Sequence, residues 1–293
     1  MYNYPVCPVC KSEDFGPVLQ AKDTTVSNEM FQICHCRNCD QRFTNPVPEA
    51  EAIGPYYKSE AYISHSNTSQ GLINRLYQTV RKITLRSKRK LVTGETGAVK
   101  GDILDIGSGA GAFLAEMQQS GWKAIGLEPD EDARTVAQAD FGVESQEIDR
   151  LFELPENSVD AITMWHVLEH VHELDLYLEK MKSLLRSKGA IFIAVPNYTS
   201  WDARKYKERW AAYDVPRHLY HFAPVSMKVL IERHGLKVAK LKWMPFDSFY
   251  VSMLSERNHG GSVLRGIWNG FCSFLVAMRR TDRCSSIIYV VKK

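Results

Sequence analysis

The sequence predicts an α/β protein whose core is a mostly parallel β-sheet with helices on both faces. Residues 102–129 follow the order strand, glycine-rich turn, helix, strand and acid, which is one βαβ unit. Further apolar runs occur at residues 161–165, 189–195, 236–243 and 286–291, with helical patterns at 130–141 and 225–234 between them. A chain of 293 residues, 44% of them hydrophobic, can bury one full core and carry a small appendage.

The glycine-rich turn is the main candidate for ligand binding. It follows the apolar run 103–106, precedes a helix at 112–120, and consists of small residues: Gly107, Ser108, Gly109, Ala110 and Gly111. Glycine lets the backbone approach a ligand closely. Asp105, two residues before the turn, would repel the pyrophosphate of a dinucleotide but would attract an ammonium group or another cation. Glu128 ends the second strand, where an acid can accept hydrogen bonds from both ribose hydroxyls.

This stretch resembles motif I of the class I S-adenosylmethionine-dependent methyltransferases, and residues 126–130 resemble the acid at the end of their second strand. The resemblance implies a Rossmann-like fold over residues 101–293 with a seven-stranded sheet, and methyl transfer from S-adenosylmethionine rather than NAD chemistry. It implies that Asp105, the turn residues and Glu128 bind the cofactor. It also implies an acid near the adenine amino group, for which Asp149 is our choice and Glu147 the alternative.

The N-terminal segment, residues 1–48, predicts a small zinc ribbon. Five of the seven cysteines lie in the first 39 residues. Cys7-x-x-Cys10 and Cys36-x-x-Cys39 are two turns that each point two thiolates at one ion, and together they close a tetrahedron. A four-cysteine site is closed, so we expect a structural zinc. Cys34 and His35 are further donors that complicate the assignment. The combination resembles a bacterial group that includes methyltransferases of nucleotide-linked sugars, although Asp40 stands where such knuckles usually have glycine.

Residues 49–100 predict a linker and a basic amphipathic helix. The linker contains the aromatic residues Tyr56, Tyr57 and Tyr62, which we expect near the mouth of the active site. The helix at 71–91 has an apolar stripe and a face with seven basic residues and no acid. Such a face suits anionic lipid or nucleic acid, or it is a solvated face of a helix packed beside the core. The net charge of +3 is too small to argue for nucleic acid.

Catalytic residues are expected after the strand at 161–165, because active residues of open α/β sheets gather at the carboxyl ends of strands. His166, Glu169 and His170 are spaced to share one helical face. The set resembles the Glu-x-x-Glu-His metal site of certain O-methyltransferases, such as those of ubiquinone synthesis, with His in place of the first Glu. The same run also occurs in methyltransferases without a metal, so both interpretations stay open.

The segment 196–223 is rich in aromatic and charged residues and is expected to form a cap over the acceptor. Its His218 and His221 join His166 and His170 as candidates for the catalytic base, since imidazole titrates near working pH. We expect a small-molecule, glycan, nucleotide-sugar or lipid-linked acceptor. The alternatives are an RNA methyltransferase that grips phosphates with ribbon and basic helix, and a non-catalytic cofactor-binding protein. No Asp/Asn-Pro-Pro-aromatic tetrad for amino-nitrogen methylation is present.

Residues 262–278 form an apolar segment that is too short and too polar to span a bilayer, since it contains Arg265 and Asn269. We expect an interfacial helix or a dimer face. The polar start of the chain does not resemble a signal peptide. The expected location is therefore the cytoplasm, with peripheral membrane contact and homodimer formation as open options.

Overall fold

The computed structural model describes residues 1–57 and 72–293 of the chain, and the side chains of 72–77 are not described. Tyr62 and the first turns of the basic helix, with the apolar stripe residues Leu72, Ile73 and Leu76, therefore lie outside the described side chains.

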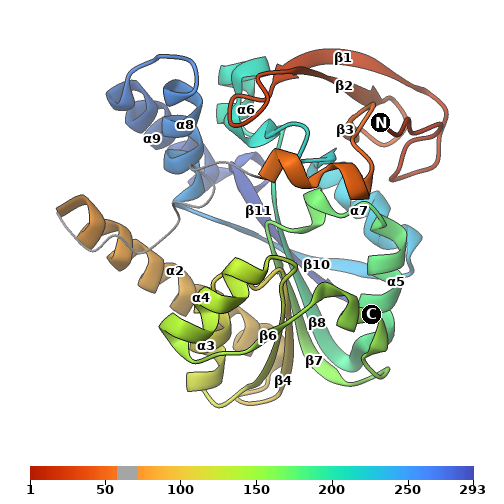
Figure 1. Ribbon diagram of the computed structural model, residues 1–293, viewed down its shortest axis with the longest axis vertical. Coiled ribbons are helices and arrows are strands. Elements are labelled where there is room, and N and C mark those ends of the chain that lie inside the picture. The colour runs from red at the N-terminus through yellow and green to blue at the C-terminus, as the bar shows by residue number, and fades with distance from the viewer. Residues whose placement is uncertain (58–71) are drawn as a thin grey trace.

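The core is a seven-stranded sheet in the order β10-β11-β8-β7-β4-β5-β6 (Figure 1). Its strands are β4 (Asp102–Ile106), β5 (Lys123–Leu127), β6 (Ser145–Gln146), β7 (Val159–Trp165), β8 (Leu185–Pro196), β10 (Lys237–Trp243) and β11 (Ser286–Lys292). The five strands β6, β5, β4, β7 and β8, in this spatial order, each pair in parallel with their neighbours. Strand β11 is antiparallel to both of its neighbours, β8 and β10. The predicted fold is confirmed. The strand order reverses beside β4, which is the point where open α/β sheets bind ligands.

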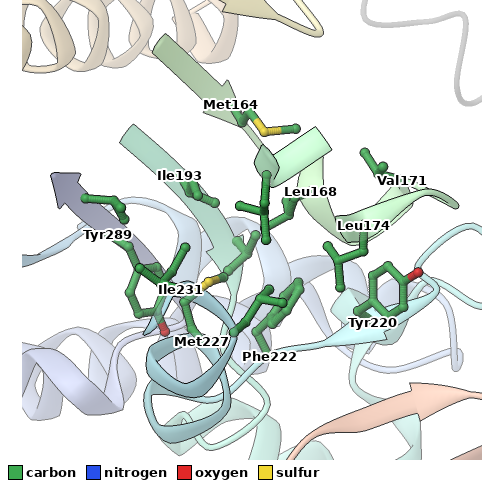
Figure 2. Close-up of a cluster of buried hydrophobic side chains, with 14 of the residues drawn as sticks. Met164, Leu168, Val171, Leu174, Ile193, Tyr220, Phe222, Met227, Ile231 and Tyr289 are labelled. Carbon is green, nitrogen blue, oxygen red and sulfur yellow. The ribbon is translucent and has the colours of Figure 1, made fainter. Parts of the chain in front are cut away.

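Helices cover both faces of this sheet: α2 (Leu72–Thr96), α3 (Ala112–Gln119), α4 (Glu131–Phe141), α5 (Leu174–Leu184) and α7 (Pro224–Arg233). Alternate residues of β8 serve the two layers, because successive side chains of a strand point to opposite faces. Ile191 and Ile193 pack in the cluster that includes α5 and α7, whereas Phe192 and Ala194 pack in the cluster that includes α2 and α3. Figure 2 shows part of the first cluster, in which side chains of α7 meet those of β7 and β8.

A second, antiparallel sheet has the order β1-β2-β3-β9. Its strands are β1 (Phe15–Lys22), β2 (Met30–Cys36), β3 (Arg42–Thr44) and β9 (Tyr220–His221). The last strand belongs to the predicted cap, so the cysteine-rich segment and the cap share one sheet. Side chains reinforce the junction: Thr44 Oγ1 donates to the carbonyl oxygen of His218 at 2.9 Å, and Gln41 Nε2 donates to that of His221 at 3.1 Å. In Figure 1 this sheet lies above the seven-stranded one.

The remaining helices are α6 (Trp201–Tyr206) in the cap and the pair α8 (Asp247–Arg257) and α9 (Val263–Arg279). Short 3-10 turns are η1 (Ala50–Ala52), η2 (Gly54–Tyr57), η3 (Ile148–Glu153), η4 (Leu168–His170), η5 (Lys207–Arg209), η6 (Ala211–Tyr213) and η7 (Thr281–Arg283). Within the described part of the chain, no helix has both the length and the apolar character needed to cross a bilayer.

Candidate cofactor and acceptor site

The three glycines of the turn after β4 all have positive φ angles, of +71°, +53° and +77°, but they meet different surroundings. A Cβ on Gly107 would lie 2.4 Å from Val167 Cγ2, and one on Gly111 would lie 2.7 Å from Ala137 Cβ. These two glycines allow close packing within the protein. A Cβ on Gly109 would meet nothing within 4 Å. The middle glycine therefore faces open space, which is where a ligand of this turn would lie.

Two buried acids flank the turn. Asp105, in β4, is 1% exposed and its Oδ1 accepts a hydrogen bond of 2.6 Å from Thr163 Oγ1. Burial raises the pKa of Asp105 to about 7. Glu128 accepts hydrogen bonds from the backbone N–H groups of Gly109 at 2.7 Å and Asp130 at 3.0 Å, and burial raises its pKa also. Acids on both sides of an open glycine turn fit a cofactor with an ammonium group and ribose hydroxyls, as S-adenosylmethionine has.

The other predicted cofactor residues occupy the same end of the sheet or its margin. Ser108 Oγ lies 2.8 Å from Ser145 Oγ at the start of β6. Asp149 is exposed on η3, and its place near an adenine stays a prediction. Glu147, the alternative, is also exposed, and its Oε1 lies 3.5 Å from Arg134 Nη2.

Lys88 of α2 is a site residue that the sequence analysis missed. Its Nζ lies 4.2 Å from the centre of the Trp165 ring. Burial lowers the pKa of Lys88 to about 8, and the charges of Asp247 and Asp105 act in the opposite direction. The sequence did contain a signal for Lys88. It stands three residues after Leu85 and four before Val92, both of which pack against the core, so all three lie on one helical face. The described part of the basic helix thus packs beside the core and directs one ammonium group towards the site.

His166 directly follows β7 and lies between two carboxylates. Its φ of +60° is a left-handed conformation that strains a residue with a side chain and is frequent at functional sites. Nδ1 is 3.4 Å from Glu169 Oε1, and Nε2 is 3.2 Å from Oδ2 of Asp247, the first residue of α8. Burial alone would lower the pKa of His166, but the two carboxylates raise it to about 9. His166 is therefore positively charged at neutral pH, and its side chain is 34% exposed.

Glu169, His170 and His218 form a second group beside it, with one donor atom each within 4.8 Å of the others. The rings of His170 and His218 meet edge to face at 4.5 Å. Glu169 is fully buried, and neither of its carboxylate oxygens has a hydrogen-bond partner among the described residues. A buried carboxylate and two imidazoles could hold a divalent ion. The charge of His166 also balances Glu169, so the metal and metal-free interpretations both stay open.

The protonation of the two imidazoles follows from their neighbours. His170 Nδ1 contacts the carbonyl oxygen of Arg217 at 3.0 Å and the Tyr57 hydroxyl at 2.9 Å. His218 Nδ1 contacts the carbonyl oxygen of Ala212 at 2.9 Å. Because a carbonyl only accepts, both Nδ1 atoms carry a proton, which leaves Nε2 as the nitrogen of each ring that can accept one. Burial lowers the pKa of His170 to about 4, and the His218 charge adds to this effect.

His221, the fourth predicted base, lies in β9 of the second sheet. Its Nε2 is 3.2 Å from Thr44 Oγ1, and burial lowers its pKa well below the ordinary value. Tyr57, from the linker, does reach the site through its contact with His170.

The four predicted zinc ligands converge at the N-terminal end. The Sγ atoms of Cys7, Cys10, Cys36 and Cys39 all lie within 4.8 Å of one another, and two of their separations are 3.6 Å. A tetrahedral zinc with Zn–S bonds of about 2.3 Å requires S···S distances of roughly 3.8 Å, so the geometry fits. Cys34 lies in β2 outside this group, and His35 Nε2 instead contacts Asp40 Oδ1 at 2.7 Å.

The site and fold define a class I methyltransferase, and comparison with known proteins agrees. Residues 74–241, more than half of the chain, match the family model described as a methyltransferase domain. The chain therefore belongs to this family of methyltransferase domains.

Curated relatives cover the central part of the chain. The chain is 28% identical over 148 residues to the ubiquinone biosynthesis O-methyltransferase of Bartonella bacilliformis, which covers 46% of this chain and 60% of that protein. It is 24% identical over 164 residues to the mitochondrial ubiquinone biosynthesis O-methyltransferase of Homo sapiens. This alignment covers 50% of this chain and 44% of the human protein. The chain thus spans only about half of these relatives. A solved structure, a putative sarcosine dimethylglycine methyltransferase from Galdieria sulphuraria, superposes with a TM-score of 0.51 at 13% identity over 75% of this chain and 88% of that one, which shows the shared fold.

Proposed function

We propose that the methyl acceptor is a small molecule, glycan, nucleotide sugar or lipid-linked intermediate with a hydroxyl group, bound between the carboxyl ends of the core strands and the cap. The observation that carries the proposal is the cluster of His166, Glu169, His170 and His218, which joins the end of β7 to the cap. The names of the curated relatives, O-methyltransferases of ubiquinone biosynthesis, support an oxygen acceptor.

The residues of the chain supply positioning and proton removal. S-adenosylmethionine, when bound, carries the methyl group on a sulfonium, and Asp105, Gly109 and Glu128 would hold it. An attacking hydroxyl must lose its proton, and His166 already carries one at neutral pH. We assign the base to His218, because its Nδ1 donates to a carbonyl oxygen and its Nε2 would be the atom that accepts the proton. Asp214 Oδ2, 3.9 Å from Nε2, would stabilise the imidazolium that forms. His166 then acts as a positioning residue for Glu169 and Asp247.

Calorimetry with S-adenosylmethionine, S-adenosylhomocysteine and NAD tests the cofactor side. We expect the first two to bind and NAD not to bind, and the reverse result would overturn the proposal. The acceptor side is tested by incubating the enzyme with methyl-labelled cofactor and extracts of a deletion strain. Label in a small-molecule or lipid fraction supports the proposal, whereas label in RNA would contradict it.

We also propose one structural zinc ion per chain, held by Cys7, Cys10, Cys36 and Cys39. Elemental analysis of protein purified without added metal should give one zinc. The double variant Cys36→Ser/Cys39→Ser should lose it, and the matched control Cys34→Ser/Cys272→Ser should keep it. Full zinc content in both double variants would remove the assignment.

A further inference from the structure

Helix α9 presents its large apolar side chains to the outside. Seven of them are exposed: Leu264 by 78%, Trp268 by 63%, Met278 by 61%, Val263 by 55%, Leu275 by 44%, Ile267 by 43% and Phe271 by 42%. Their spacing of three, four and seven residues places them on one helical face. The buried face carries small and polar residues instead: Gly266, Asn269, Gly270, Ser273 and Ala277. The usual arrangement of a surface helix, apolar inside and polar outside, is inverted here.

The inward face is fixed by contacts that only small residues permit. A Cβ on Gly266 would lie 2.7 Å from Met253 Cα, and one on Gly270 would lie 2.7 Å from Phe249 Cα, so the backbones of α8 and α9 are in close contact. Asn269 Nδ2 donates to Tyr206 Oη and Ser273 Oγ to Asp202 Oδ1, both at 2.8 Å. These contacts lock the rotation of α9. Its apolar stripe cannot turn inward, and it needs a partner outside.

The charges around the stripe are basic. Residues 262–280 contain Arg265, Arg279 and Arg280 and no acid. Arg265 lies 3.9 Å from the buried Glu256, and Arg280 pairs with Asp282 at 2.7 Å. Lys82, Arg86 and Lys90 form an exposed row on α2, which lies with the α8–α9 pair on the left side of Figure 1.

We propose that α9 docks on an anionic lipid bilayer, with the helix lying in the interface and its apolar stripe in the acyl region. An exposed apolar face with tryptophan and flanking arginines matches the acyl layer and the anionic headgroups at once. Since α8, which packs against the inner face of α9, begins at Asp247 beside His166, the α8–α9 pair adjoins the acceptor end. A consequence that rests on the proposed function is that the methyl acceptor reaches the site from the membrane surface.

Flotation with vesicles of phosphatidylcholine and phosphatidylglycerol tests the docking without any acceptor. The protein should float with the anionic vesicles and float less with pure phosphatidylcholine or in high salt. Leu264→Ser/Trp268→Ser should lower the bound fraction at least about tenfold, as loss of buried apolar area requires. The control Leu176→Ser changes an apolar residue of α5 that is 46% exposed and should bind normally. Arg265→Glu/Arg279→Glu should also weaken binding, and the charge-matched control Lys123→Glu/Lys188→Glu should not.

A second readout places the helix at the lipid directly. Brominated lipids should quench tryptophan fluorescence on binding, and Trp268→Phe should still float but lose most of that quenching. Cooperative thermal unfolding of each variant shows that it is folded, and this control does not depend on the proposed function. Failure of the wild type to float overturns the proposal. So does a dimer that becomes a monomer in Leu264→Ser/Trp268→Ser without any vesicle binding, because a second copy would then cover the stripe.

Discussion

Gly109→Ala should separate cofactor binding from folding, because Gly109 faces open space in the turn after β4. A Cβ there meets no protein atom within 4 Å, whereas one on Gly107 or Gly111 would collide with neighbouring side chains. The substitution therefore adds a methyl group only where the cofactor would lie. Gly97 provides a matched control: its φ is +68°, a Cβ on it also meets nothing within 4 Å, and it follows α2 on the way to the start of β4.

The expected stability change is the same for both variants. A left-handed alanine costs about 1–2 kcal/mol of backbone strain. Roughly 0.4–1 kcal/mol of this is returned because alanine lowers the entropy of the unfolded chain. We thus expect each variant to lose about 1 kcal/mol of unfolding free energy. Only Gly109→Ala should lose cofactor affinity, by at least about tenfold, which corresponds to 1.4 kcal/mol.

Thermal unfolding and calorimetric titration with S-adenosylhomocysteine measure the two effects on the same samples. The melting temperatures of the two variants should agree within about 2 °C, as their equal strain implies. Their dissociation constants should differ strongly. Wild-type affinity in Gly109→Ala, or an equal loss in Gly97→Ala, would show that the open space beside Gly109 is not the cofactor site.

Three further predictions concern charges of the site. Cofactor affinity should rise as the pH increases through about 7 and then level off. The reason is that the ammonium group of the cofactor binds ionised Asp105, whose pKa is raised by burial to about 7. In calorimetry, Asp105→Asn should bind the cofactor weakly and without this pH dependence. Lys88→Met should lower affinity near pH 7, because loss of the ammonium group raises the pKa of Asp105 further; Lys90→Met, on the exposed row, should match the wild type in the same titration. NMR titration should find a pKa of about 9 for His166. The contribution of its carboxylate pairs to the free energy of unfolding is therefore complete below pH 6.5 and disappears as the pH rises through 9. Asp247→Asn should lower that pKa by about one unit or more, worth roughly 1.4 kcal/mol for each unit, and an unchanged pKa would contradict the assigned contact.

The core could be predicted from the sequence because its signals are local. Apolar runs, the glycine turn and the acid after the second strand identified β4, α3 and β5 to within one residue at each end. Strand β8 begins at Leu185, four residues before the predicted run at 189, because Arg186, Ser187 and Lys188 interrupt its apolar pattern. Helix α8 was not predicted because its buried face is mostly polar and therefore gives no apolar stripe. The buried residues are Ser248, Val251, Ser252, Ser255 and Glu256.

The site was predictable only in part, because half of it comes from long-range contacts. Cofactor candidates within one βαβ unit followed from spacing. Asp247 could not be found in this way, since it meets His166 from 81 residues further along the chain. Lys88 was obscured by the other basic residues of α2. The pairing of His218 with Glu169 and His170 depends on how the cap folds back, which no local pattern specifies.

The second sheet connects the four-cysteine cluster to the cap. Strand β3 lies between the cysteine-rich β2 and the cap strand β9, so one continuous ladder joins His35, the residue before Cys36, through Arg42 to His221. The side chain of Arg42 in β3 lies 4.3 Å from the centre of the Tyr198 ring and donates to Tyr213 Oη at 2.9 Å, both in the cap. Because Thr44 also holds the backbone of His218, the order imposed on Cys36 and Cys39 by a bound ion extends through β3 to the proposed base. The contacts of Gln41, Arg42 and Thr44 thus hold the cap against the cysteine-rich segment, and we expect loss of the proposed zinc to disturb the position of His218.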